Sequence, residues 1–100
     1  MTKVAIYVEL KAKSGKESEL ASFLKSAQSL AAAETGTVSW FAVRFDDSTF
    51  AIFDTFNDDA GREAHLNGPI AAALMKRAEE LLATSPQIRK ATVLADKLPG

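Results

Sequence analysis

Alternation of apolar and polar residues predicts a first β-strand over residues 4–10. One side of this segment is apolar throughout, and the other side is mixed and carries Tyr7. A period of two with β-branched residues is typical of a strand with one face on a core. The residues on the apolar side are Val4, Ile6, Val8 and Leu10.

A long helix is predicted next. Ser14-Gly15-Lys16-Glu17 matches a capping box, in which the serine and the glutamate satisfy backbone amides at a helix start. Apolar residues then recur at helical spacing. They are Leu20, Phe23, Leu24, Ala27, Leu30 and Ala31. Gly36 stands where a left-handed residue commonly ends a helix, so we expect it to terminate this one.

A β-hairpin is predicted over residues 37–56. Thr37 to Phe45 and Thr49 to Phe56 are rich in β-branched and aromatic residues, and Asp46-Asp47-Ser48 between them suits a tight turn. Both faces of the hairpin are apolar. The first strand carries Val38, Trp40 and Ala42 on one side and Phe41, Val43 and Phe45 on the other. The second strand carries Phe50, Ile52 and Phe56 on one side and Ala51 and Phe53 on the other.

The last part of the chain predicts an interrupted helix and a final strand. Asn57-Asp58-Asp59 supplies helix-capping chemistry for a helix that reaches Leu66. Asn67-Gly68-Pro69 interrupts this helix, and proline at a first helical position restarts it. An apolar stripe follows until Thr84-Ser85-Pro86 ends the helix, and residues 90–98 form the strand. The stripe consists of Ile70, Leu74, Met75, Ala78, Leu81 and Leu82.

The order strand, helix, strand, strand, helix, strand predicts an α+β fold of the ferredoxin-like βαββαβ type with an antiparallel sheet, in a single domain over residues 1–100. Both helices should cover one face of the sheet. The apolar second face of the hairpin then needs a partner, so we expect a homodimer with two sheets packed face to face.

Composition narrows the possible functions. The net charge is −1 and charges of both signs are mixed along the chain, which argues against nucleic-acid and membrane surfaces. The absence of cysteine excludes thiolate chemistry and favours a cytoplasmic location. One histidine without cysteine predicts no metal site within one chain. No glycine-rich nucleotide fingerprint is present, so we expect no bound cofactor, and redox chemistry would use the substrate itself.

Three residues are candidates for catalysis. His65 is the only histidine and suits a general base, or it simply caps a helix end. Asp54 is an acid in an apolar strand, and Arg44 on the neighbouring strand is its expected partner. Arg44 would hold an anionic oxygen while Asp54 orients a base; the alternative is a structural ion pair at the rim of the sheet.

Four residues are candidates for substrate binding. Trp40 and Phe56 could form a flat slot for an aromatic ring, although core packing is the simpler interpretation of such residues. Tyr7 could hydrogen-bond a ligand or anchor an interface, and Asn67 could bind a substrate oxygen or act only as a helix cap.

The chain resembles the antibiotic biosynthesis monooxygenase family. The resemblance rests on Gly36 with Ser39-Trp40-Phe41, on Phe53-Asp54-Thr55-Phe56, and on the segment from Glu63 to Pro69. It implies a dimeric α/β barrel, and cofactor-free oxidation of a small electron-rich aromatic, such as a phenol, quinol or anthrone, by dioxygen.

Two positions depart from the family pattern. Members often carry tryptophan where Phe56 stands and a second histidine where Ile70 stands. These departures leave open a non-catalytic ligand-binding or stress-response dimer. Haem binding or degradation is a further alternative, weakened because the first strand lacks the asparagine that the haem-degrading branch uses.

Overall fold

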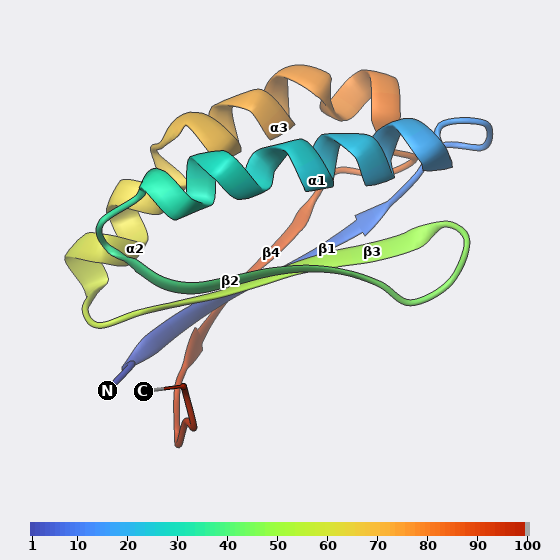
Figure 1. Ribbon diagram of the computed structural model, residues 1–100. Coiled ribbons are helices and arrows are strands. Elements are labelled where there is room, and N and C mark those ends of the chain that lie inside the picture. Colours follow the sequence, from blue (N-terminus) through green and yellow to red (C-terminus); the bar gives the residue numbers. More distant parts are fainter. Residues whose placement is uncertain (100) are drawn as a thin grey trace.

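The computed structural model, which describes residues 1–99, contains one antiparallel sheet in the order β2-β3-β1-β4 (Figure 1). The strands are β1 (Val4–Lys11), β2 (Thr37–Arg44), β3 (Thr49–Phe56) and β4 (Gln87–Thr92), and the helices are α1 (Glu17–Ala33), α2 (Asp59–Leu66) and α3 (Pro69–Leu81). This is the ferredoxin-like α+β fold that the sequence predicts. α2 and α3 are the two halves of the predicted interrupted helix.

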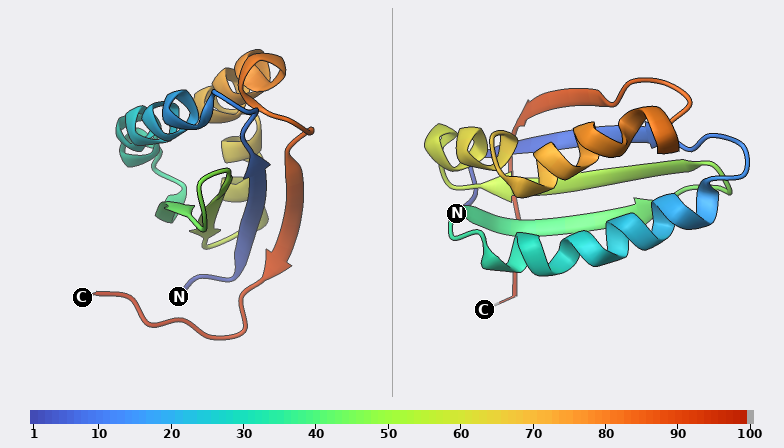
Figure 2. Two further views of the ribbon diagram at one scale, coloured as in Figure 1. Left: turned by 90° about the vertical axis from the view of Figure 1, so that its right-hand side faces the viewer. Right: turned by 90° about the horizontal axis from the view of Figure 1, so that it is seen from above.

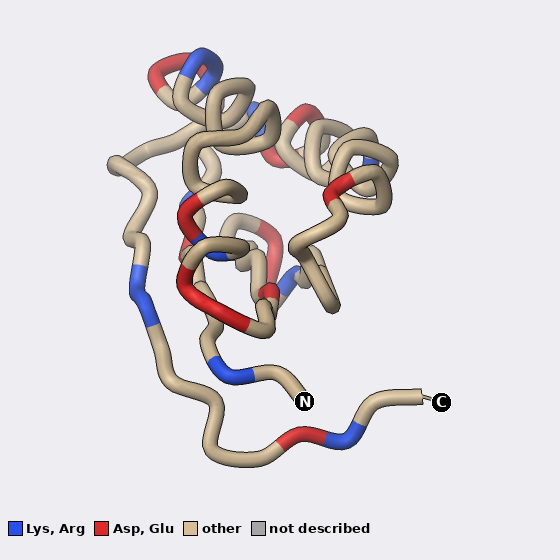
Figure 3. Tube along the Cα trace, turned by 90° about the vertical axis from the view of Figure 1, so that its left-hand side faces the viewer, with Lys and Arg blue, Asp and Glu red and all other residues tan. Residues whose placement is uncertain are grey.

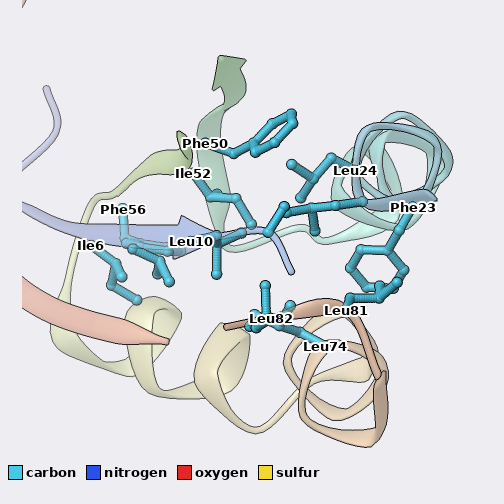
Figure 4. Close-up of a cluster of buried hydrophobic side chains, with 13 residues drawn as sticks. Ile6, Leu10, Phe23, Leu24, Phe50, Ile52, Phe56, Leu74, Leu81 and Leu82 are labelled. Carbon is cyan, nitrogen blue, oxygen red and sulfur yellow. The ribbon is translucent and has the colours of Figure 1, made fainter. Parts of the chain in front are cut away.

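The long helices α1 and α3 lie side by side over one face of the sheet, and the opposite face is left open (Figure 2). Between helices and sheet lies the main apolar core (Figure 4). Leu10, Leu20, Phe56 and Leu81 are completely buried there. Each such side chain stabilises the fold by about 1.5–3 kcal/mol relative to an exposed one.

Strand register decides which residues face this core. Asp54 of β3 is opposite Ile6 of β1 and Trp40 of β2. Because paired residues point to the same side of a sheet, all three side chains lie on the helix-covered face. A carboxylate is therefore placed inside the apolar layer.

The predicted ends of the first helix are wrong in detail. No serine cap forms: α1 begins at Glu17 after Lys16, and the Glu17 carboxylate instead accepts a hydrogen bond from the Gly15 amide. Gly15 takes the left-handed conformation (φ +86°) in this turn. Gly36 does not, because α1 ends at the extended residue Glu34.

Gly36 has a different role, which is close packing. A Cβ added to Gly36 would lie 3.1 Å from the Gly61 Cα, and one added to Gly61 would lie 3.0 Å from the Gly36 carbonyl oxygen. Two glycines thus let the backbone of α2 approach the chain that enters β2. Asp58 caps α2 by accepting a hydrogen bond from the Gly61 amide, as predicted from the residue type.

Two predictions at the C-terminal end are also wrong. β4 spans Gln87–Thr92 and not residues 90–98, because β1 begins at Val4, which is opposite Thr92. Beyond it the chain leaves the sheet, tied by hydrogen bonds from Thr2 to Asp96 (Figure 2). Met75, predicted in the apolar stripe of α3, is exposed.

Charged residues of both signs are interspersed along the elements (Figure 3). Over residues 1–99, no helix has the length and apolar character needed to cross a membrane.

We predict that Gly61→Ala destabilises the protein by about 1–3 kcal/mol, because the added methyl group would lie 3.0 Å from the Gly36 carbonyl oxygen, closer than ordinary van der Waals contact. Intrinsic helix propensity alone would predict that the substitution raises the free energy of unfolding by about 1 kcal/mol. Urea unfolding measures the difference. The control is Ala64→Gly at an exposed position of α2, which reports propensity alone. A stabilised Gly61→Ala variant would contradict the close approach of the two backbones.

Candidate functional site

The side chains of Glu34, Asp54 and His65 form one cluster beneath the helices, called here the acidic cluster. His65 Nδ1 lies 2.6 Å from Glu34 Oε1. His65 Nε2 lies 2.8 Å from Asp54 Oδ2, a close ion-pair contact without hydrogen-bond alignment. The side chain of Asp54 is 1% exposed and that of His65 is 8% exposed. An imidazole is therefore held between two carboxylates, away from water.

Each member of the acidic cluster comes from a different element. Asp54 belongs to β3, His65 lies in the last turn of α2, and Glu34 is the residue that ends α1. Thr37 at the start of β2 donates a hydrogen bond from its hydroxyl to Glu34 Oε1 at 2.7 Å. The cluster thus joins three elements that are distant in sequence.

The two carboxylates determine the charge of His65. Burial by itself would lower the pKa of His65, but Asp54 and Glu34 outweigh it and raise the pKa from 6.5 to about 9. His65 is therefore an imidazolium at neutral pH. In that state it can donate a proton but cannot accept one, which differs from the base role predicted for it.

Some polar atoms of this region have no hydrogen-bond partner within residues 1–99. They include Trp40 Nε1, Asp54 Oδ1 and Glu34 Oε2, all buried. Trp40 and Asp54 are directly opposite each other on β2 and β3. The donor Trp40 Nε1 and the acceptor Asp54 Oδ1 thus belong to residues that are directly opposite each other, and the Cβ atoms of such residues are about 4.5–5.5 Å apart. Buried polar groups are usually paired, so such atoms indicate a place where a polar ligand atom fits.

Trp40 also lines a cleft between α1 and β2. The cleft has a volume of about 410 Å³. Its lining consists of Ala21, Leu24, Lys25, Gln28, Trp40, Ala42, Val43, Arg44 and Phe50. A second hollow of about 290 Å³ shares Gln28 and Trp40 and extends to Thr37. Trp40 is thus the cleft-lining residue that is directly opposite Asp54 on the neighbouring strand.

The structure brings together two of the three predicted catalytic residues, His65 and Asp54. The expected pairing of Arg44 with Asp54 does not form. Arg44 is opposite Phe50, four pairs along the hairpin from the pair of Trp40 and Asp54, and its guanidinium donates hydrogen bonds to the carbonyls of Asp46 and Asp47. Arg44 lines the cleft with Trp40 instead.

The other predicted binding residues are dispersed. Phe56 is completely buried, and its ring centroid lies 5.4 Å from that of His65, so it supports the imidazole. Tyr7 is opposite Phe53 and therefore lies on the open face of the sheet. Asn67 is exposed, and its side chain donates a hydrogen bond to the Glu63 carbonyl at the end of α2.

Glu34 is the residue that sequence reasoning missed. A signal was present: an acid at a helix C-terminus faces the negative end of the helix dipole, which costs up to about 1 kcal/mol without compensation. The compensation is the cation His65, 31 residues away in the chain.

Comparison with known proteins shows which family the chain belongs to. The protein NE2512 from Nitrosomonas europaea, of unknown function, is 58% identical, with 100% of this chain and 97% of that chain covered and a TM-score of 0.98. The chain belongs to the same family as NE2512. No family model and no curated protein matches it.

Solved structures of lower identity establish the fold. A "putative antibiotic biosynthesis monooxygenase" from Nitrosomonas europaea is 12% identical, with 92% of this chain and 99% of that chain covered and a TM-score of 0.83. PA3566 from Pseudomonas aeruginosa is 24% identical, with 95% of this chain and 97% of that chain covered and a TM-score of 0.81. The chain has the antibiotic-biosynthesis-monooxygenase-like fold, which confirms the predicted resemblance.

We predict that stability falls as pH rises through the pKa of His65. The pKa is about 9 when folded and 6.5 in its ordinary state, so the cluster stabilises the fold fully below about pH 6.5. About 2–3 kcal/mol is lost as the imidazolium deprotonates. Urea unfolding across this pH range measures the loss.

The control for this prediction is the isosteric double variant Glu34→Gln with Asp54→Asn, in which the pH dependence should largely disappear. His65 is the only histidine, so its Cε1–H resonance reports its pKa directly by NMR in the wild type. A measured pKa near 6.5 would contradict the assignment of His65 as an imidazolium.

Proposed function

We propose that this chain is a cofactor-independent monooxygenase that oxidises a small electron-rich aromatic, such as a phenol, quinol or anthrone, with dioxygen. The observation that carries the proposal is the acidic cluster together with a cleft whose lining residue Trp40 is opposite Asp54 of that cluster. The antibiotic-biosynthesis-monooxygenase-like fold supports it. We keep the cytoplasm as the proposed compartment because the chain has no cysteine.

The proposed substrate lies in the cleft with its reacting carbon or hydroxyl directed past Trp40. A substrate oxygen there accepts a hydrogen bond from Trp40 Nε1, the donor that has no partner within residues 1–99. Asp54 Oδ1, free on the paired position, receives the substrate proton. Asp54 is completely buried, so entry requires the indole of Trp40 to turn aside.

Each proton of the proposed reaction has a group that carries it. For an anthrone-like substrate, Asp54 removes a proton from the activated CH₂ group, and the resulting carbanion reduces dioxygen and combines with it to give a peroxide anion. The His65 imidazolium protonates this anion to a hydroperoxide. Loss of water then leaves a carbonyl, so CH₂ and O₂ become C=O and H₂O. A positioned acid and base in such steps each typically contribute 10²–10⁴-fold in rate.

One observation favours a second function, a ligand-binding protein without catalysis. The acidic cluster is closed to solvent in the structure, as a purely structural ion-pair network would be. Haem ligation by His65 receives less support, because both ring nitrogens contact carboxylates and have no free lone pair to offer to iron.

We also propose that the protein is a homodimer through the open face of the sheet. Phe41, Phe53 and Tyr7 form one row across β2, β3 and β1 on that face. Phe41 is 55% exposed, Phe53 is 39% exposed, and Phe45 beyond the end of β2 is 60% exposed. A contiguous aromatic patch of this kind usually marks an interface. A second copy fits it, because two such sheets pack face to face about a two-fold axis.

The oxidation is tested by oxygen uptake of the purified, metal-free protein with anthrones and quinols. Asp54→Asn should reduce the rate above autoxidation by about 100-fold or more, because the variant retains the shape of the carboxylate but not its basicity. Trp40→Phe should reduce it by about 10-fold, because it removes one hydrogen bond and keeps the ring.

Lys76→Gln, at an exposed position of α3, is the control and should keep the wild-type rate. Full activity in Asp54→Asn would assign the proton acceptor elsewhere. Absence of uptake with every substrate would favour the ligand-binding alternative.

The dimer is tested by sedimentation of Phe41→Asp, which should be a monomer because it places a charge in the buried interface. Met75→Asp is the matched control: Met75 is similarly exposed, at 59%, but lies on α3 on the other side of the molecule. A monomeric wild type, or a Phe41→Asp variant that still dimerises, would contradict the proposed interface.

A further inference from the structure

We propose that the cleft between α1 and β2 is specific for an aromatic ligand that carries an anionic group, such as a carboxylate. This inference deepens the proposed function, on which it rests for the claim that the ligand is the substrate. The binding itself stands on the residues of the cleft.

Two cations and no acid line this cleft. Lys25 projects from α1 and Arg44 from β2, on opposite sides of it, and Gln28 adds an amide. Neither cation forms a salt bridge within residues 1–99. Asp46 and Asp47 follow Arg44 in the turn, but neither is among the lining residues, so the charges that line the cleft are both positive and attract anions.

Arg44 is held in place before any ligand arrives. Its Nε and Nη2 donate hydrogen bonds to the carbonyls of Asp46 and Asp47 at 3.2 and 2.9 Å, and its guanidinium carbon lies 4.8 Å from the Phe50 ring centroid. Its Nη1 has no hydrogen-bond partner within residues 1–99. A donor fixed in this way loses little entropy when it binds a carboxylate.

The remaining walls suit an aromatic ring. Leu24, Trp40, Ala42 and Phe50 contribute apolar surface, and the volume of about 410 Å³ lies within the range of small-ligand sites. A planar ring against these walls would place its carboxylate between Lys25 and Arg44. Its other end would reach Trp40, which is opposite Asp54 on the neighbouring strand.

The test is titration of the full chain with 2-naphthoate and with 2-naphthamide, which share a ring system and differ in charge. Trp40 is the only tryptophan, so its indole N–H cross-peak in a ¹H–¹⁵N spectrum reports the cleft directly. We expect 2-naphthoate to bind about 10-fold more tightly than 2-naphthamide. Lys25→Gln and Arg44→Gln should each weaken 2-naphthoate by about 3-fold and together by about 10-fold, as exposed ion pairs do.

The affinity for 2-naphthamide should be unchanged in these variants, which separates loss of charge from damage to the cleft. Lys76→Gln should bind both probes as the wild type does. Equal affinity for the two probes, no saturable shift of the Trp40 peak, or undiminished 2-naphthoate binding in the double variant would each overturn the inference. If 2-naphthoate binds as expected while no quinol or anthrone supports oxygen uptake, the proposed function fails and the anion site remains.

Discussion

The contact of His65 with two carboxylates is the interaction on which the placement of the other elements depends. Burying Asp54 and Glu34 in a small apolar core is unfavourable unless a cation pairs with them. That cation, His65, is on the short helix α2, which must therefore lie close to β3 and to the end of α1. Gly36 and Gly61 allow the backbones to approach, the Asp58 cap starts the helix, and Pro69 begins α3 directly after it.

The sheet separates two kinds of surface with different roles. Its helix-covered face holds the core, the acidic cluster and the cleft, whereas its open face exposes a row of aromatic side chains. Alternation along each strand makes this separation strict, so neighbouring residues such as Trp40 and Phe41 serve different surfaces. The proposed chemistry and the proposed dimer interface can therefore change independently of each other.

The cleft and the acidic cluster are complementary in charge. The cluster carries two carboxylates and one imidazolium, while the cleft carries Lys25 and Arg44. Trp40 lines the cleft, has a buried N–H, and is opposite Asp54 of the acidic cluster. An anionic aromatic would be attracted at one end and deprotonated at the other, which is a physical basis for binding a substrate in one orientation.

The sequence by itself determined the order of the elements and the fold class, because local periodicity, the Asp58 cap and Pro69 are read from residues close together in the chain. It also identified His65, Asp54 and Trp40 by residue type. It paired Asp54 with Arg44 because both lie on the hairpin, but the register sets Arg44 opposite Phe50. Glu34 was missed because its partner is 31 residues away. Only the tertiary structure brings these charges together, and only burial between two carboxylates makes His65 an acid, since a pKa depends on neighbours in space.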